Sequence, residues 1–152
     1  MVLIDTNSLL VLIIGLIDKK QITTHKRTSV FEEEDFETLL TYISDLGKLV
    51  VLPNIWTEVD NLLNGFSGDL KWNYVKTLKR VTSQSTEKYL STFSALERLE
   101  FWDLGLTDTL LLQVANQCEL LITSDSKLAD YAKAMNVNTL DLVEQRNIRL
   151  RN

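Results

Sequence analysis

The sequence predicts an α/β fold in which a small parallel sheet is sandwiched between helices. Short, wholly apolar runs of strand length alternate with longer segments whose apolar residues recur at helical spacing. Runs that are apolar at every position are typical of parallel strands buried on both faces. At 152 residues, the chain is long enough to bury roughly two-thirds of its unfolded surface. We therefore expect a single domain spanning residues 1–152.

The first expected strand, 2–4, ends at Asp5, and polar turn residues lead into an apolar helix that ends near Ile17. Residues 18–34 form a polar connection, and a helix starting near Glu32 follows. The second strand, 48–52, stops at Pro53, which cannot continue a strand ladder. We expect Asn54 to cap a helix that ends at Leu63.

The second half of the chain repeats this alternation. Two helices are expected over 71–81 and 86–101, separated by the polar residues 82–85. Thr107 is the expected N-cap of a helix over 108–117. The remaining strands are expected at 119–123 and 137–141, with a short helix at 127–135 between them and a polar tail after 141.

Composition limits the possible chemistry and the expected location. One cysteine, Cys118, and one histidine, His25, exclude an internal disulfide framework and make a soft-ligand zinc site improbable. No positive charge precedes the apolar run 8–17, which is far shorter than the ~20 residues that span a bilayer. We expect a cytoplasmic protein with no membrane contact. Because this helix is apolar on more than one face, we also expect it to support self-association.

Four carboxylates lie just after a strand or at the start of a helix: Asp5, Glu58, Asp108 and Asp125. Each also has a local explanation. Asp5 can be a turn residue and Glu58 a solvated helix residue, whereas Asp108 suits the helix dipole and Asp125 suits a cap. In a parallel sheet, however, strand ends and the helices that follow them share one edge. We therefore expect the four side chains to converge on one cleft. Because we expect Asp5 to lie at this edge and not in the core, Asp5→Asn should leave the fold intact.

Carboxylates held close together repel one another unless a cation neutralises them. Oxygen-rich clusters of this kind are the preferred environment of Mg²⁺ or Mn²⁺. Such ions lower the pKa of bound water and stabilise both oxygens of an in-line phosphoryl displacement. The net charge of −5 argues against a surface coated in basic residues but not against a local basic patch.

Four motifs, in order, resemble those of the PIN-domain nucleases. The first is the apolar strand that ends in Asp5-Thr6-Asn7, and the second runs from Leu52-Pro53 to Glu58. The third is the segment 104–112, in which Asp108 opens an apolar helix. The fourth is 121–129, in which a strand, a Thr and Asp125 lead into a helix. Together they cover residues 1 to about 142.

The resemblance implies a metal-dependent endoribonuclease that hydrolyses RNA phosphodiesters. It implies that Asp5, Asp108 and Asp125 bind Mg²⁺ or Mn²⁺ directly, and that Glu58 binds a metal or orients the attacking water. Asn7 and Thr123 would support the pocket through hydrogen bonds. Many small members of the family are dimeric toxins of toxin–antitoxin pairs, which implies a homodimer and an antitoxin partner. The long connection at 18–34 departs from most of those toxins.

Three alternatives remain. The first is a structure-specific DNA nuclease, which the sequence also allows because no element in it senses a 2′-hydroxyl. A non-catalytic PIN-like binding module would share the fold alone. A phosphoryl-accepting receiver domain is disfavoured, because the second strand does not end in an Asp and no Lys follows the last strand. The segments 71–80 and 25–27 interleave basic and aromatic residues, which suits phosphate contact and base stacking but is also typical of a solvated helix.

Overall fold

The computed structural model describes all residues, 1–152, and contains one five-stranded sheet in which every neighbouring pair is parallel. The strands are β1 (Val2–Ile4), β2 (Leu49–Val51), β3 (Thr86–Glu87), β4 (Leu120–Thr123) and β5 (Thr139–Asp141), in the order β3-β2-β1-β4-β5. The predicted α/β class with a small parallel sheet between helices is confirmed, and the arrangement is consistent with a PIN-like fold.

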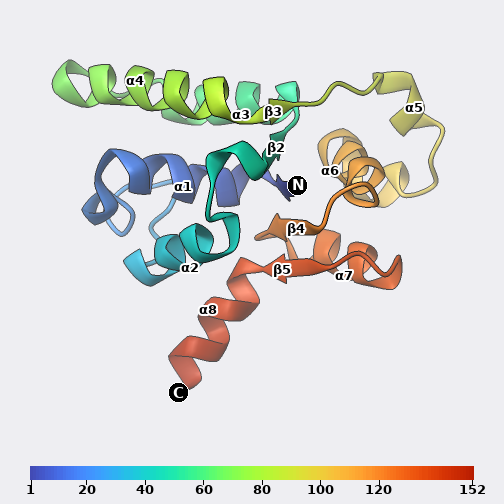
Figure 1. Ribbon diagram of the computed structural model, residues 1–152. Coiled ribbons are helices and arrows are strands. Elements are labelled where there is room, and N and C mark those ends of the chain that lie inside the picture. The colour runs from blue at the N-terminus through green and yellow to red at the C-terminus, as the bar shows by residue number, and fades with distance from the viewer.

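Eight helices surround this sheet. They are α1 (Thr6–Asp18), α2 (Glu33–Ile43), α3 (Pro53–Leu63), α4 (Gly68–Gln84), α5 (Thr92–Leu96), α6 (Phe101–Ala115), α7 (Ser126–Ala134) and α8 (Leu142–Arg151). A 3₁₀ turn at Lys19–Gln21 begins the connection after α1, and a second one at Leu46–Lys48 directly precedes β2. In Figure 1, α1 and α2 lie to the left of the strands and α6 and α7 to the right, so the sheet is covered on both sides.

Helix α1 is the centre of the hydrophobic core. Every residue from Leu9 to Ile14 is at most 1% exposed, because α1 packs against α2, α3 and α4 as well as the sheet. Gly15 allows a close contact with α2, since a Cβ at this position would lie 2.2 Å from the Phe36 ring. The expectation that this helix has apolar surface to spare for self-association is therefore wrong. Its additional apolar faces are buried by the chain's own helices.

The expected helix over 86–101 is replaced by β3, an extended stretch and α5. Val50 and Val51 of β2 pair with Thr86 and Glu87, and Lys88 donates its backbone N–H to the Val51 carbonyl (3.1 Å). These residues become a sheet edge because β2 leaves one side free for pairing, which helical periodicity alone does not reveal.

The expected break at 82–85 is absent, and α4 continues to Gln84. The Thr82 and Ser83 hydroxyls donate to the carbonyls of Leu78 (2.7 Å) and Arg80 (2.8 Å). Ser and Thr side chains that bond back to the preceding turn are compatible with a helix interior. The polar residues that suggested a linker are therefore accommodated within the last turn.

The expected polar tail forms helix α8, which Asp141 caps by accepting the backbone N–H groups of Val143 and Glu144. Arg149 fixes this helix to the start of α2. Its guanidinium donates to Asp35 (2.8 Å) and Glu32 (3.0 Å), and the Asp35 side chain is completely buried. A charge-assisted contact between residues 114 positions apart orders this segment.

The strand order places a crevice between β1 and β4. The chain leaves β1 toward β2 on one side and later returns to β4 on the other, so the order reverses at this pair. Open α/β sheets bind ligands beyond the carboxyl ends of strands at such a switch point. Asp5 directly follows β1, and Asp125 lies two residues past β4. No helix of the structure is long and apolar enough to cross a membrane.

Candidate active site: an acidic pocket at the switch point

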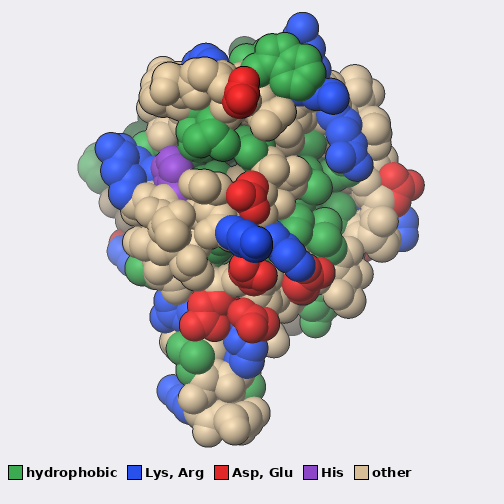
Figure 2. All heavy atoms as spheres, turned by 90° about the vertical axis from the view of Figure 1, so that its left-hand side faces the viewer, with side chains coloured by type: hydrophobic (Ala, Val, Ile, Leu, Met, Phe, Trp, Pro, Cys, Tyr) green, Lys and Arg blue, Asp and Glu red, His purple; other side chains and the backbone are tan.

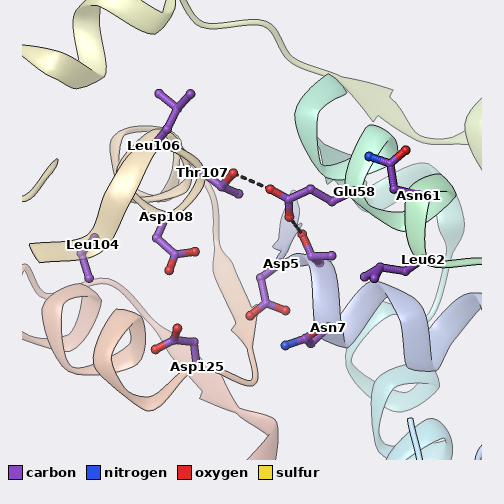
Figure 3. A pocket seen from close by; sticks show the side chains of 11 residues that line it. Asp5, Asn7, Glu58, Asn61, Leu62, Leu104, Leu106, Thr107, Asp108 and Asp125 are labelled. Atoms are coloured by element: carbon purple, nitrogen blue, oxygen red, sulfur yellow. Dashed lines mark hydrogen bonds between the residues drawn. The ribbon is translucent and has the colours of Figure 1, made fainter. Parts of the chain in front are cut away.

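A pocket of about 620 Å³ opens beyond the ends of β1 and β4. It contains all four predicted carboxylates, contributed by the β1–α1 junction, α3, α6 and the start of α7 (Figure 3). The lining residues are Asp5, Thr6, Asn7, Glu58, Asn61, Leu62, Leu104, Leu106, Thr107, Asp108 and Asp125. Figure 3 shows the carboxylates of Asp5, Asp108 and Asp125 pointing toward a common space. The predicted convergence is therefore observed.

Asp5 is 5% exposed and holds the two central strands together. One carboxylate oxygen accepts the Ser8 backbone N–H (2.9 Å), which caps α1. The other accepts the Ser124 backbone N–H (2.9 Å) and the Thr123 hydroxyl (2.5 Å). Thr123 thus supports the pocket as expected, whereas Asn7 lines it. The amide of an asparagine in place of Asp5 has one acceptor oxygen and could not accept all these bonds, so we expect Asp5→Asn to weaken the fold at this edge.

Glu58 lies on α3, where both of its carboxylate oxygens accept threonine hydroxyls from other elements. Thr107 of α6 donates to one oxygen (2.6 Å) and Thr6 of α1 donates to the other. Thr107 was expected to cap the helix and instead orients this carboxylate. Asn54 likewise does not cap α3, because Leu52 occupies the N-cap position. The side-chain amide of Asn54 instead donates to the Thr107 hydroxyl (3.3 Å).

Asp125 caps α7 and still presents a free oxygen to the pocket. One of its carboxylate oxygens accepts the backbone N–H groups of Lys127 (2.9 Å) and Leu128 (3.1 Å). The local explanation as a cap is therefore correct for Asp125, and Asp5, for which a turn role was the local explanation, also caps a helix. The same residue also places a negative charge at the mouth of the pocket, because the strand β4 ends directly beneath it.

Asp108 is the carboxylate without a hydrogen-bond partner. It lies on α6 after a break at Gly105, whose φ of 79° a residue with a side chain rarely adopts. The break redirects the helix, and the Thr109 hydroxyl bonds to the Gly105 carbonyl (2.6 Å). The half-buried Asp108 side chain consequently projects into the pocket with no N–H or O–H group to stabilise its charge.

The electrostatic field of the pocket is strongly negative. Burial first, and then the charges of Asp125, Asp5 and Glu58 in that order of importance, raise the pKa of Asp108 to about 7. Burial also raises the pKa of Asp5, against the opposing effect of its hydrogen bonds to Thr123, Ser8 and Ser124. No Lys, Arg or His lines the pocket. Four acidic groups therefore share one space without a protein cation.

The donor chemistry of the pocket fits a hydrated Mg²⁺ or Mn²⁺ ion. Hard carboxylate oxygens are the ligands these ions prefer, and Asp108 and Asp125 have oxygens with no hydrogen bond. No group of three acidic, histidine or cysteine side chains is arranged to hold an ion directly. Mg²⁺ commonly binds through one or two carboxylates and retains several waters. A cage of three protein ligands is therefore not required.

Asp103, only five residues before Asp108, lies outside this field. Its carboxylate accepts Lys127 Nζ (2.9 Å) and the Tyr131 hydroxyl (2.7 Å) on the surface, and these bonds lower its pKa. Sequence reasoning did not identify Thr6, Thr107 and Asn61 as pocket residues. Threonines at 6 and 107 each neighbour a predicted acidic residue, but their shared partner, Glu58, is distant in the sequence.

The fold and the pocket define an α/β protein with an acidic site at the switch point of a parallel sheet. Comparison of the chain with protein-family models, curated proteins and solved structures gave no match.

Proposed function

We propose that this protein is a divalent-metal-dependent endoribonuclease with a PIN-like active site. The observation that carries the proposal is the convergence of four carboxylates on one pocket that no basic side chain lines. Burial and the charges of Asp125, Asp5 and Glu58 raise the pKa of Asp108 to about 7, in agreement with this geometry. The charges of the other three carboxylates all act on Asp108, so the four belong to one site, and a perturbed acidic group in a cleft is typical of functional sites. Mg²⁺ or Mn²⁺ is the cation that satisfies such a site.

The charge of the pocket favours metal catalysis over catalysis by side chains alone. A phosphodiester is an anion, and a cleft with four carboxylates and no basic side chain repels it. A bound divalent ion would reverse this repulsion, lower the pKa of a bound water and stabilise charge on the phosphoryl oxygens. Asp108 and Asp125 are the residues best placed to hold the ion.

The other two carboxylates have supporting tasks. Asp5 is held by three hydrogen bonds and provides a fixed negative charge at the floor of the pocket. Glu58 is held by two hydroxyls, and each of its oxygens retains a lone pair that can accept a hydrogen bond from a water molecule. This preorganisation suits Glu58 to orienting the attacking water.

The test is incubation of purified protein with single-stranded and structured RNA in Mg²⁺, in Mn²⁺ and in excess EDTA. We expect internal cleavage that requires the metal, and Asp108→Asn should reduce its rate at least about 100-fold. Asp103→Asn is the matched control, since its carboxylate binds Lys127 outside the pocket. Cleavage that persists in EDTA would contradict the metal mechanism. Cleavage of DNA in preference to RNA would favour a DNA nuclease.

A further inference from the structure

Helix α4 concentrates positive charge on a protein that is negative overall. Its 17 residues include four cations and one acid, Asp69, which gives a net charge of +3 on a chain of −5. The four cations are Lys71, Lys76, Lys79 and Arg80. None of them forms a salt bridge, although five other basic side chains of the protein do. The charge of α4 is therefore free to attract an anionic partner.

One face of α4 combines these cations with exposed apolar surface. Trp72, Val75, Lys76 and Lys79 are spaced i, i+3, i+4 and i+7, which places them on a single stripe. They line a shallow hollow of about 260 Å³. Figure 2 shows hydrophobic side chains bordered by basic ones at the top of the molecule, over α4. The opposite stripe is buried, with Tyr74 and Val81 in the core.

Trp72 has the geometry of a stacking platform. Its side chain is 64% exposed, and the Lys76 ammonium lies 5.0 Å from the ring centroid, which is a cation–π distance. The helix beneath is held firmly, because Tyr74 donates to Asp60 of α3 (2.7 Å) and packs against Phe66. The large aromatic ring is therefore presented to solvent from a rigid base, beside two lysines.

The hollow is close to the acidic pocket along the chain. Helix α3 contributes Asn61 and Leu62 to the pocket and ends at Leu63, and α4 begins at Gly68. Five backbone steps to Gly68 and four helical residues to Trp72, where the hollow begins, together span at most about 24 Å. A strand of nucleic acid of several nucleotides could therefore contact both sites.

We propose that the Trp72 hollow of α4 binds single-stranded RNA, with a base stacked on the indole and flanking phosphates on Lys76 and Lys79. Flat aromatic rings between basic side chains are the recurring means of holding single strands without sequence preference. An acidic protein segment would use the lysines but would not need an exposed indole. The inference extends the proposed nuclease function, and its test is independent of catalysis.

The experiment measures binding of a fluorescein-labelled single-stranded RNA of about 12 nucleotides, by fluorescence anisotropy, in EDTA so that no metal-dependent cleavage occurs. We expect Trp72→Ala to weaken binding about 5- to 150-fold, the range for loss of one base stack. Lys76→Gln and Lys79→Gln should each weaken binding and reduce the salt dependence by about 0.7 in log–log slope. Thermal melts check that each variant remains folded.

Trp102→Ala is the matched control. Trp102 is 86% exposed on α6, but the neighbouring Arg98 and Lys127 are paired with Glu100 and Asp103. Unchanged binding in this variant together with weakened binding in Trp72→Ala supports the proposal. Equal RNA binding by wild type and Trp72→Ala overturns the proposal. Binding of labelled polyglutamate is measured in parallel, and a loss in Trp72→Ala as large as the loss of RNA binding also overturns it, because it would indicate an acidic protein partner. RNA binding through Trp72 by a protein that does not cleave RNA in Mg²⁺ would refute only the proposed nuclease function.

Discussion

Asp108→Asn should stabilise the metal-free protein, although it changes a side chain at the centre of the proposed site. The carboxylate has no hydrogen-bond partner, and its pKa is raised from 3.8 to about 7 by burial and by Asp125, Asp5 and Glu58. The unfolded chain releases this proton at lower pH than the folded chain does. The free energy of unfolding therefore falls as pH rises from about 4 to about 7, and the loss is complete above that.

The magnitude follows from the difference between the two pKa values. At about 1.36 kcal/mol for each pH unit, this difference corresponds to an upper bound of about 4 kcal/mol. Because the side chain is only half-buried, solvent screening reduces the figure, and we expect about 2 kcal/mol. For a chain of this length, that gain should raise the melting temperature by about 4–8 °C at alkaline pH.

The assay is thermal melting of wild type and Asp108→Asn at several pH values between about 4.5 and 8.5, with EDTA or with Mg²⁺. In EDTA, the melting temperature of Asp108→Asn should exceed that of wild type by an amount that grows with pH. A Mg²⁺ concentration about 100-fold above Kd should stabilise wild type by about 2.7 kcal/mol and the variant much less. Asp103→Asn, which loses a surface ion pair, should give no gain at any pH. If the difference in melting temperature between wild type and Asp108→Asn does not change with pH, the four carboxylates do not share one electrostatic field.

Three further substitutions test the contacts that position the site. Asp5→Asn should lower the free energy of unfolding by about 1–3 kcal/mol, because an amide cannot accept the N–H groups of both Ser8 and Ser124; a melting temperature raised as much as in Asp108→Asn would contradict this. Gly15→Ala should destabilise by about 1–3 kcal/mol, since its Cβ would lie 2.2 Å from the Phe36 ring. Denaturant titration should show partial recovery when Phe36→Leu is added, and no effect of Gly15→Ala alone would refute the close packing. Arg149→Gln should destabilise by about 2–4 kcal/mol, because Asp35 would remain buried without its cation. A double-mutant cycle with Asp35→Asn measures the coupling, and strictly additive effects would show that the pair is not coupled.

The α/β class and the positions of the four carboxylates could be predicted from the sequence because both are local properties. Wholly apolar runs such as 2–4 and 120–122 indicate buried parallel strands wherever they occur. A parallel sheet then brings every strand end to one edge, so Asp5 and Asp125 were expected at the same edge, and the pairing of β1 with β4 makes them neighbours. Glu58 and Asp108 followed from the same rule, because each lies near the start of a helix packed at that edge.

The contacts that orient these residues were decided by the tertiary structure. Thr6 and Thr107 meet on Glu58 across about 50 residues of sequence, and α8 is ordered by the Arg149–Asp35 pair across 114. Hydrophobic periodicity shows which face of an element is apolar but not what covers it, which is why the apolar faces of α1 suggested a partner surface. The sequence by itself determined which charges would gather at the end of the sheet. Only the packing of α3 against α1 and of α6 against β1 decided that Glu58 would be held by hydroxyls and that Asp108 would be left without a hydrogen-bond partner.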